Sequence, residues 1–244
     1  LLDCAIVLAA GEGTRMKSAT PKVLHEIAGR SLLGHVLAAV SEITPAQLCV
    51  VVGAGREAVE SHLKEIAPTA KTVFQDRRGG TGHATQLALA EIKVSGTVII
   101  LAGDTPMLTG ASLKELVAAH KATGATASVL TAEHPDPTGY GRIIRADDGT
   151  LLRIVEEKDA DEDQKMIFEI NSGVYAFDGA KLAGAITKLT SANAQGELYL
   201  TDVIEILRNE GGTIGAVLIE DFVETLGVND RYQLAESAAM LRDR

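Results

Sequence analysis

The sequence predicts an α/β fold built on a doubly wound, mostly parallel sheet, with a small β-hairpin lobe in the second half. Short, near-continuous apolar runs alternate with amphipathic helical patterns over the first 130 residues. Such runs are typical of parallel strands that are covered on both faces. After Pro135 the pattern changes to apolar and polar residues in alternation on both sides of an Asp-Gly pair, which is typical of a hairpin.

The first half supplies five predicted strands and the helices between them. The strands are predicted at 4–9, 48–52, 72–75, 97–102 and 126–131. Ser31 is a suitable N-cap for a helix with one apolar stripe, made of Leu32, Leu33, Val36, Leu37 and Val40. Further helices are predicted at 56–66, 82–92 and 111–123. Such strand–helix–strand units connect by right-handed crossovers, and ligands bind beyond the carboxyl ends of the strands.

The second half begins with the predicted hairpin, whose strands 141–146 and 150–157 flank the turn Asp147-Asp148-Gly149. We then expect, in order, a strand at 170–177, helices at 179–189 and 197–209, a strand at 213–220 and a final helix from about residue 231. No internal repeat interrupts this order, so a single domain accounts for the chain.

Composition and charge exclude several classes of protein. With 244 residues and 46% apolar content, the chain can bury a large core. A net charge of −10 argues against a nucleic-acid partner, because phosphate backbones require a basic face. No apolar run approaches the roughly 18–20 residues of a membrane span, so no membrane partner is expected. Cys4 and Cys49 lie in apolar runs and are predicted to be reduced core thiols of a cytoplasmic enzyme.

The segment after the first predicted strand has the composition of a phosphate-binding loop. Gly11 and Gly13 allow backbone N–H groups to approach a phosphate closely, because no Cβ stands in the way. Cations able to neutralise a polyphosphate follow locally, at Arg15, Lys17, Lys22 and Arg30. An acidic protein can therefore still bind a nucleoside triphosphate at this loop.

Two commoner nucleotide-binding motifs do not fit this loop. The string Gly-x-x-x-x-Gly-Lys-Ser/Thr occurs nowhere in the chain. The dinucleotide fingerprint Gly-x-Gly-x-x-Gly is broken by Met16 at its sixth position. The second predicted strand also ends in Val52-Gly53-Ala54-Gly55, without the acidic residue that would bind a ribose, which excludes a dehydrogenase.

Two side chains near strand ends are candidates for ligand binding. Asp104 follows the strand 97–102 through Gly103, so its carboxylate should emerge at the crevice. Mg²⁺ prefers one or two carboxylates together with phosphate oxygens and water, so we predict that Asp104 is a metal ligand. Gln75 precedes the glycine-rich segment 79–83, and an amide can pair with the edge of a base. A plain helix entrance explains that second pattern equally well.

The glycine loop and several later motifs together resemble a known family. Gly11, Gly13, Thr14, Arg15, Pro21 and Lys22 fill the slots of the signature loop of sugar-phosphate nucleotidyltransferases. The motifs at 75–83, 136–142, 155–159, 169–173, 193–202 and 227–229 then occur in order. Over its whole length the chain resembles the uridyltransferase domain of bacterial N-acetylglucosamine-1-phosphate uridyltransferases, which have a Rossmann-like nucleotidyltransferase fold.

This resemblance implies transfer of UMP from UTP to N-acetylglucosamine 1-phosphate, with release of pyrophosphate and Mg²⁺ as cofactor. Arg15 and Lys22 are implied as catalytic residues that hold the phosphates, and Asp104 and Asn229 as the metal ligands. The implied sugar-binding residues are Gly141, Glu156 and Asn171. The implied nucleotide-binding residues are Leu8, Ala9, Ala10, Gly11, Gly13, Gln75, Gly80, Thr81 and Gly103.

The resemblance also implies how the chain is organised. Within one nucleotidyltransferase domain, 1–244, we expect a nucleotide-binding half (1–130), a sugar-phosphate-binding half (131–230) and a C-terminal helix (231–244). The family commonly carries a left-handed β-helix that acetylates glucosamine 1-phosphate and builds a trimer. Because no hexapeptide periodicity occurs here, we expect that domain to be absent and this chain to be a monomer, a shortened form of such an enzyme.

Departures from the family pattern and alternative interpretations remain. Ala102 stands where the family often has an aromatic residue, and Asp230, which stands where it has asparagine, is expected to cap the final helix. Asp159-Ala160-Asp161 has a metal-binding form, but its acidic surroundings favour a solvated loop. The six histidines show no ligand spacing and are expected to be structural or surface groups. The alternatives are another pair of sugar 1-phosphate and nucleotide, or a non-catalytic nucleotide-sensing module.

Overall fold

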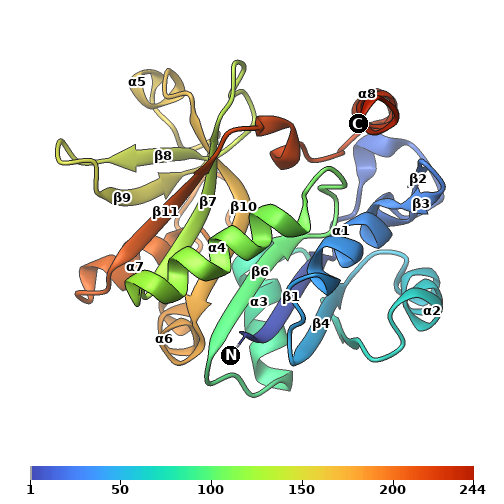
Figure 1. Cartoon of the computed structure of the whole chain (residues 1–244), viewed down its shortest axis with the longest axis horizontal. Coiled ribbons are helices and arrows are strands. Elements are labelled where there is room, and N and C mark those ends of the chain that lie inside the picture. Colours follow the sequence, from blue (N-terminus) through green and yellow to red (C-terminus); the bar gives the residue numbers. More distant parts are fainter. Residues whose placement is uncertain (1) are drawn as a thin grey trace.

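A nine-stranded sheet forms the centre of the molecule in the computed structural model, which describes residues 2–244 (Figure 1). Four strands of the first half lie side by side and parallel: β5 (Lys71–Phe74), β4 (Gln47–Val52), β1 (Leu2–Ala9) and β6 (Thr97–Ala102). All four were predicted to within two residues at each end. Leu1, which belongs to the expected domain 1–244, lies outside the described residues.

The second half of the chain joins this sheet through one antiparallel strand. Strand β10 (Glu169–Asp178) lies between β6 and β7 (Ala127–Glu133) and is antiparallel to both. Strand β11 (Ile214–Ile219) pairs with β7 in parallel at the edge of the sheet. The predicted hairpin is formed by β8 (Arg142–Arg145) and β9 (Leu151–Val155), and β8 pairs with β10. A separate pair, β2 (Glu26–Ile27) and β3 (Arg30–Ser31), was not predicted.

Helices cover both faces of the sheet, which confirms the doubly wound fold. One face packs against α1 (Leu32–Ser41), α2 (Arg56–Ile66) and α4 (Gly110–Thr123), and the other against α3 (Gly80–Glu91), α6 (Gly179–Ala185) and α7 (Asp202–Asn209). Strand β1 serves both cores because successive side chains point to opposite faces. Ala5 and Val7 belong to the first core, and Cys4 and Ile6 to the second.

The predicted helix caps are present. The Ser31 hydroxyl accepts a hydrogen bond from the backbone N–H of Gly34 at 2.9 Å, at the start of α1. The carboxylate of Asp230 accepts one from the N–H of Gln233 at 2.8 Å, at the start of α8 (Arg231–Asp243). The unusual aspartate at position 230 therefore acts as a helix cap, as expected.

One helix begins later than predicted. Helix α7 begins at Asp202, so the start predicted at residue 197 was wrong. The Asn193 amide already bonds the backbone of the segment that follows it, including the carbonyl oxygen of Glu197 at 2.6 Å. The backbone of Leu198 is paired with Gly79 and Gly82, which lie at the start of α3. These backbone groups are therefore unavailable for a helical turn. The helix predicted at 179–189 similarly ends at Ala185 and continues as a 3₁₀ turn, Ile186–Lys188.

The acidic segment Asp159-Ala160-Asp161 is a loop with both carboxylates exposed, as expected, and each carboxylate accepts a backbone hydrogen bond. Asp161 caps a one-turn helix, α5 (Glu162–Lys165), and forms a capping box with Gln164. Asp159 accepts a hydrogen bond from the backbone N–H of Ala194 at 2.8 Å. Both carboxylates are therefore engaged in holding loops in place.

The two cysteines are free and buried, as predicted. Burial raises the pKa of the Cys4 thiol to about 12 and that of the Cys49 thiol to about 11. Within residues 2–244, none of the helices combines the length and the apolar character needed to cross a bilayer.

Candidate active site

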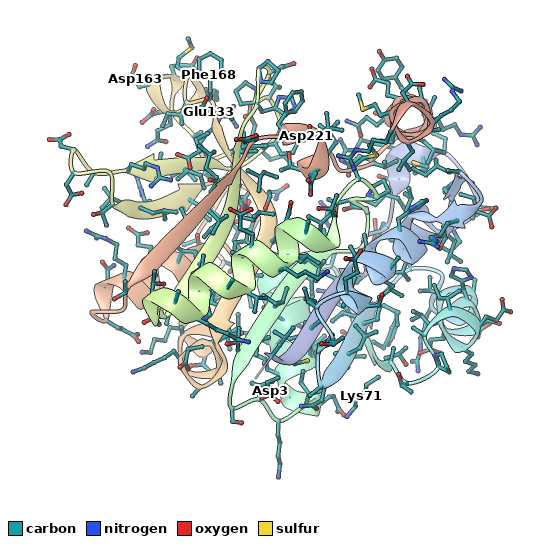
Figure 2. All side chains as sticks on the ribbon, in the orientation of Figure 1. Asp3, Lys71, Glu133, Asp163, Phe168 and Asp221 are labelled. Atoms are coloured by element: carbon teal, nitrogen blue, oxygen red, sulfur yellow. The ribbon has the colours of Figure 1, made fainter. Side chains whose placement is uncertain are left out.

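A cleft of about 1040 Å³ opens at the carboxyl ends of the parallel strands, where the doubly wound fold predicts a ligand site. It is lined by the loop that follows β1, the segment between β5 and α3, and residues of the second half. Figure 2 shows Asp3 and Lys71, which lie near the beginnings of β1 and β5, at the lower edge of the molecule, opposite the carboxyl ends of these strands. The two halves of the chain therefore meet across one cavity.

The loop after β1 is held in place by close backbone packing. Gly13 has a left-handed backbone (φ 61°), and a Cβ at this position would lie 2.6 Å from the Cβ of Lys22. Met16, which breaks the dinucleotide fingerprint, is 1% exposed and anchors the short 3₁₀ turn Thr14–Met16 in the core. Arg15 lies in the same turn and lines the cleft.

Lys22 connects the two residues that the sequence suggests as metal ligands. Its ammonium group donates to a carboxylate oxygen of Asp104 and, at 3.1 Å, to the amide oxygen of Asn229. The backbone carbonyl of Asp104 accepts a hydrogen bond from the N–H of Val228 at 2.9 Å, which fixes the segment 227–229 against the end of β6. A carboxylate oxygen and an amide oxygen from distant parts of the chain thus share one cation, the Lys22 ammonium group.

The start of α3 forms another wall of the cleft. The Gln75 backbone N–H donates to the carbonyl of Val52 at 2.8 Å, and its side-chain NH₂ donates to the carbonyl of Gly80 at 3.1 Å. The Thr81 hydroxyl accepts a hydrogen bond from the N–H of Leu200 at 3.0 Å. A segment of the second half therefore supports the helix start that carries Gln75, Gly80 and Thr81 into the cleft.

The remaining wall comes from β9, β10 and the start of α7. Burial raises the pKa of Glu156, while a hydrogen bond that its Oε1 accepts from the Thr201 hydroxyl at 3.0 Å acts in the opposite direction. The NH₂ group of Asn171 donates to the Tyr175 hydroxyl at 2.7 Å. A Cβ on Gly141 would lie 3.5 Å from the Cβ of Asn171 and 3.6 Å from Glu156 Oε2. Gly141 therefore lies directly behind these two side chains.

The comparison with known families decides the class of protein. The family described as "MobA-like NTP transferase domain" matches residues 5–174. This chain belongs to the MobA-like NTP transferase domain family. It is 54% identical over 244 residues to "Bifunctional protein GlmU" of Thermobifida fusca and 55% identical over 242 residues to the protein of that name in Streptomyces avermitilis. These alignments cover 98% of this chain and 50% of each relative, so the chain spans about half the length of the curated relatives it matches.

Solved structures confirm the NTP transferase fold. A protein from Bacillus anthracis assigned as a glucose-1-phosphate thymidylyltransferase, in complex with sucrose, has a TM-score of 0.80 at 20% identity. That comparison covers 98% of this chain and 95% of the other. A UDP-glucose pyrophosphorylase complexed with UDP-glucose has a TM-score of 0.79 at 17% identity, over 100% of both chains.

Most of the residues named from the sequence line the cleft of this NTP transferase domain. They are Leu8, Ala9, Ala10, Gly11, Gly13, Arg15, Lys22, Gln75, Gly80, Thr81, Asp104, Glu156, Asn171 and Asn229. Gly103 and Gly141 are not among the lining residues. The N–H of Gly103 donates to the carbonyl of Leu8 at 2.9 Å, so it joins β1 to β6 just below the cleft.

Two of the four cations expected near the nucleotide do not line the cleft. Lys17 ends the 3₁₀ turn with a left-handed backbone (φ 47°), and its carbonyl accepts a hydrogen bond from Arg231 of α8 at 3.1 Å. Arg30 belongs to β3, and its Cγ lies only 2.8 Å from where a Cβ of Gly34 would be. The turn and the β2–β3 pair direct these segments away from the site.

Other charged residues at the cleft were missed by sequence reasoning. Arg77, Arg78 and Lys158 line it, and Arg78 pairs with Glu197 at 2.7 Å. The buried guanidinium of Arg142 does not line the cleft, but it pairs at 2.8 Å with Glu157, which does. An inward-facing charge in a hairpin strand was the available signal for Arg142, since charged residues are rarely buried without a partner.

Proposed function

We propose that this chain is an N-acetylglucosamine-1-phosphate uridyltransferase, which transfers UMP from UTP to N-acetylglucosamine 1-phosphate and releases pyrophosphate. Membership of the NTP transferase family and 54–55% identity to two bifunctional GlmU proteins support this proposal. The observation that carries it is the shared cleft, which is lined by Arg15 and Lys22 from the first half of the chain and by Glu156 and Asn171 from the second half. We propose that the chain acts as a monomer.

The proposed reaction needs no general base. An anionic oxygen of the sugar phosphate attacks the α-phosphorus of UTP, and the bond from this phosphorus to the pyrophosphate oxygen breaks. The protein has to align two anions and offset their repulsion. Arg15 and Lys22 are the groups proposed to stabilise the charge on the α-phosphate and on the departing pyrophosphate. The main-chain N–H groups around Gly11 and Gly13 are proposed to hold the phosphate chain.

The acceptor wall has groups suited to a sugar with hydroxyls and an N-acetyl group. Thr201 engages Oε1 of Glu156, which leaves Oε2 as an acceptor for a sugar hydroxyl. Asn171 is held in position by Tyr175, at 2.7 Å, and by the N–H of Gly173, which donates to its Oδ1 at 3.1 Å. A side chain fixed in this way can select among sugars by the hydrogen bonds it still offers.

Asp104 and Asn229 are proposed to hold Mg²⁺. Their donor set fits, because the carboxylate and amide oxygens already share a cation, the Lys22 ammonium. Within residues 2–244, no cluster of three or more His, Cys, Asp and Glu side chains is arranged to bind a metal. This agrees with a Mg²⁺ ion that takes one or two protein ligands and completes its shell with phosphate oxygens and water. When bound, Mg²⁺ supplies neutralisation and orientation of the phosphate oxygens.

The test is pyrophosphate release with Mg²⁺ and UTP, in the presence and absence of N-acetylglucosamine 1-phosphate. In parallel assays, glucose 1-phosphate replaces the N-acetylated sugar phosphate, and CTP or TTP replaces UTP. We expect release to require both UTP and the N-acetylated sugar phosphate. A preference for another pair would contradict the proposed acceptor contacts. A folded protein that binds UTP without any release would instead favour a nucleotide-sensing module.

A further inference from the structure

Gln75 has a second hydrogen-bond partner that lies outside the cleft. Its side-chain Nε2 is 3.1 Å from the carbonyl oxygen of Gly80 and 3.1 Å from Nδ1 of His83. A carbonyl oxygen can only accept, so the amide group facing Gly80 has to be the NH₂. The same NH₂ reaches His83, so Nδ1 of His83 is the acceptor and the imidazole proton is on Nε2. Both N–H bonds of the Gln75 amide are therefore used.

The imidazole of His83 is held where it cannot reach a ligand in the cleft. His83 lies in the first turn of α3, is 8% exposed and is not among the residues that line the cavity. Gly79 makes room for the ring, because a Cβ there would lie 2.4 Å from Nδ1 and 2.5 Å from Cγ of His83. The ring is thus fixed against the backbone of Gly79, and Gln75 is the cleft-lining side chain to which it is hydrogen-bonded.

We infer that His83 is a positioning residue that fixes the Gln75 amide and thereby sets the preference for uracil over cytosine. The inference rests on the proposed function and on the role in nucleotide binding that the family resemblance implies for Gln75, which we place against the base. With both N–H bonds engaged, the carbonyl oxygen Oε1 is the group that the Gln75 amide has left to offer a ligand in the cleft. Uracil carries a proton on N3 that this oxygen can accept, whereas N3 of cytosine carries none. Without His83, one N–H of Gln75 loses its partner, and the amide can rotate to offer a donor instead.

The experiment compares His83→Ala and His83→Asn with the wild-type protein. Pyrophosphate release at saturating N-acetylglucosamine 1-phosphate gives kcat/KM for UTP and for CTP. The UTP/CTP ratio is the kcat/KM for UTP divided by the kcat/KM for CTP. We expect it to fall by about tenfold in His83→Ala, which is the effect of losing one neutral hydrogen bond. The fall should appear mainly as a higher KM for UTP. The ratio should recover in His83→Asn, because its short amide side chain returns an acceptor to the position of Nδ1.

Two further variants separate positioning from stability. Gly79→Ala displaces the ring without removing it and should lower the UTP/CTP ratio in the same direction. His120→Ala is the matched control, since His120 is a buried histidine that pairs with Ser128 at 3.0 Å and does not line the cleft. It should leave the UTP/CTP ratio unchanged even if its melting temperature falls. Thermal unfolding is measured for every variant, so that a loss of activity caused by unfolding can be recognised.

The outcomes distinguish this inference from the proposed function. If folded His83→Ala keeps the wild-type UTP/CTP ratio, or loses activity equally with both nucleotides, the inference is wrong. If the wild-type protein releases no pyrophosphate with any acceptor, the proposed function is wrong, and calorimetric binding of UTP and CTP decides the inference instead. If the His83 variants do not fold, Gly79→Ala becomes the test. A UTP/CTP ratio in Gly79→Ala equal to that of the wild-type protein would also overturn the inference.

Discussion

The ammonium group of Lys22 lies 3.1 Å from the amide oxygen of Asn229, a residue 207 positions later in the chain. The same ammonium pairs with the carboxylate of Asp104, and the side chains of Lys22 and Asp104 are only 10% and 18% exposed. One lysine therefore neutralises the oxygens proposed as metal ligands. A divalent cation has to compete with Lys22 for these oxygens, and this competition can be measured.

We expect Lys22→Met to bind Mg²⁺ about tenfold more tightly than the wild-type protein in the absence of nucleotide, because the competing ammonium is gone. Turnover should fall at the same time, since a proposed phosphate-binding cation is lost. Calorimetric titration with Mg²⁺ gives the affinity, and pyrophosphate release gives the turnover. Lys64→Met removes an exposed lysine of α2 and is the control. Equal Mg²⁺ affinities in the two variants would contradict the competition.

Arg15→Ala should lower turnover by about 10²–10⁴-fold, the usual effect of removing a cation from a phosphoryl-transfer site. Arg15 is exposed and lines the cleft, so the melting temperature should change little. The matched control is Lys17→Gln, which removes a charge from the same turn but outside the cleft. Near-full turnover in Arg15→Ala would rule out its catalytic role.

Gly141→Ala should weaken binding of the sugar phosphate and leave binding of UTP unchanged. The added Cβ would lie 3.1 Å from Ile154 Cγ2, so Ile154 has to shift slightly, and it would fill the space next to Asn171 Cβ at 3.5 Å and Glu156 Oε2 at 3.6 Å. We expect KM for N-acetylglucosamine 1-phosphate to rise by about tenfold through this crowding. Gly184→Ala is the control, because a Cβ in that position of α6 meets no atom within 4 Å. A change in KM for UTP alone would contradict the assignment of this wall.

The stability of the protein should fall as the pH rises from about 4 to about 6, through Asp202. Burial, followed by the nearby charges of Glu205 and Asp159, raises the pKa of Asp202 from 3.8 to about 6. Over this window the folded state binds more protons than the unfolded state, so the free energy of unfolding decreases as the pH increases. Below pH 3.8 the carboxyl is protonated in both states and this contribution is constant.

Asp202→Asn removes this dependence. The variant should gain stability relative to the wild-type protein as the pH rises through that window, and the gain should remain constant at higher pH. Denaturant unfolding at several pH values measures it. Asp163→Asn, which changes an exposed carboxylate of α5 (Figure 2), provides the comparison. A difference between Asp202→Asn and wild type that does not change with pH would refute the assignment.

Local patterns were enough to predict the layers of this fold. Apolar runs and helix caps are properties of neighbouring residues, so β1, β6 and the Ser31 cap followed from the sequence. The position of β10 between β6 and β7 did not, because strand order depends on pairing between distant segments. The start of α7 was missed for a similar reason, since the backbone of Leu198 is bonded to residues 79 and 82, more than a hundred positions earlier.

In the candidate site, too, some features could be predicted from local sequence and others depend on contacts between distant segments. The fold placed the glycine loop and Asp104 at neighbouring strand ends, so their meeting in one cleft could be predicted. The ion pair between Lys22 and Asp104 has no local signal, because it depends on how the loop after β1 turns. Lys17 and Lys22 are both cations of this loop, and the family resemblance singled out Lys22. In the structure Lys17 ends a turn with a left-handed backbone and does not line the cleft, whereas Lys22 pairs with Asp104.

The placement of β10 also governs the order in which the sheet can be completed during synthesis. Strands β1, β4, β5 and β6 come from the first 102 residues, and they can pair as soon as this part of the chain is made. One edge of β6 then remains open until residues 169–178 arrive. Open strand edges promote aggregation, so the nascent chain is exposed to misassembly for this interval. The strand that ends this exposure carries Asn171, so protection of the folding chain and the proposed choice of sugar depend on one segment.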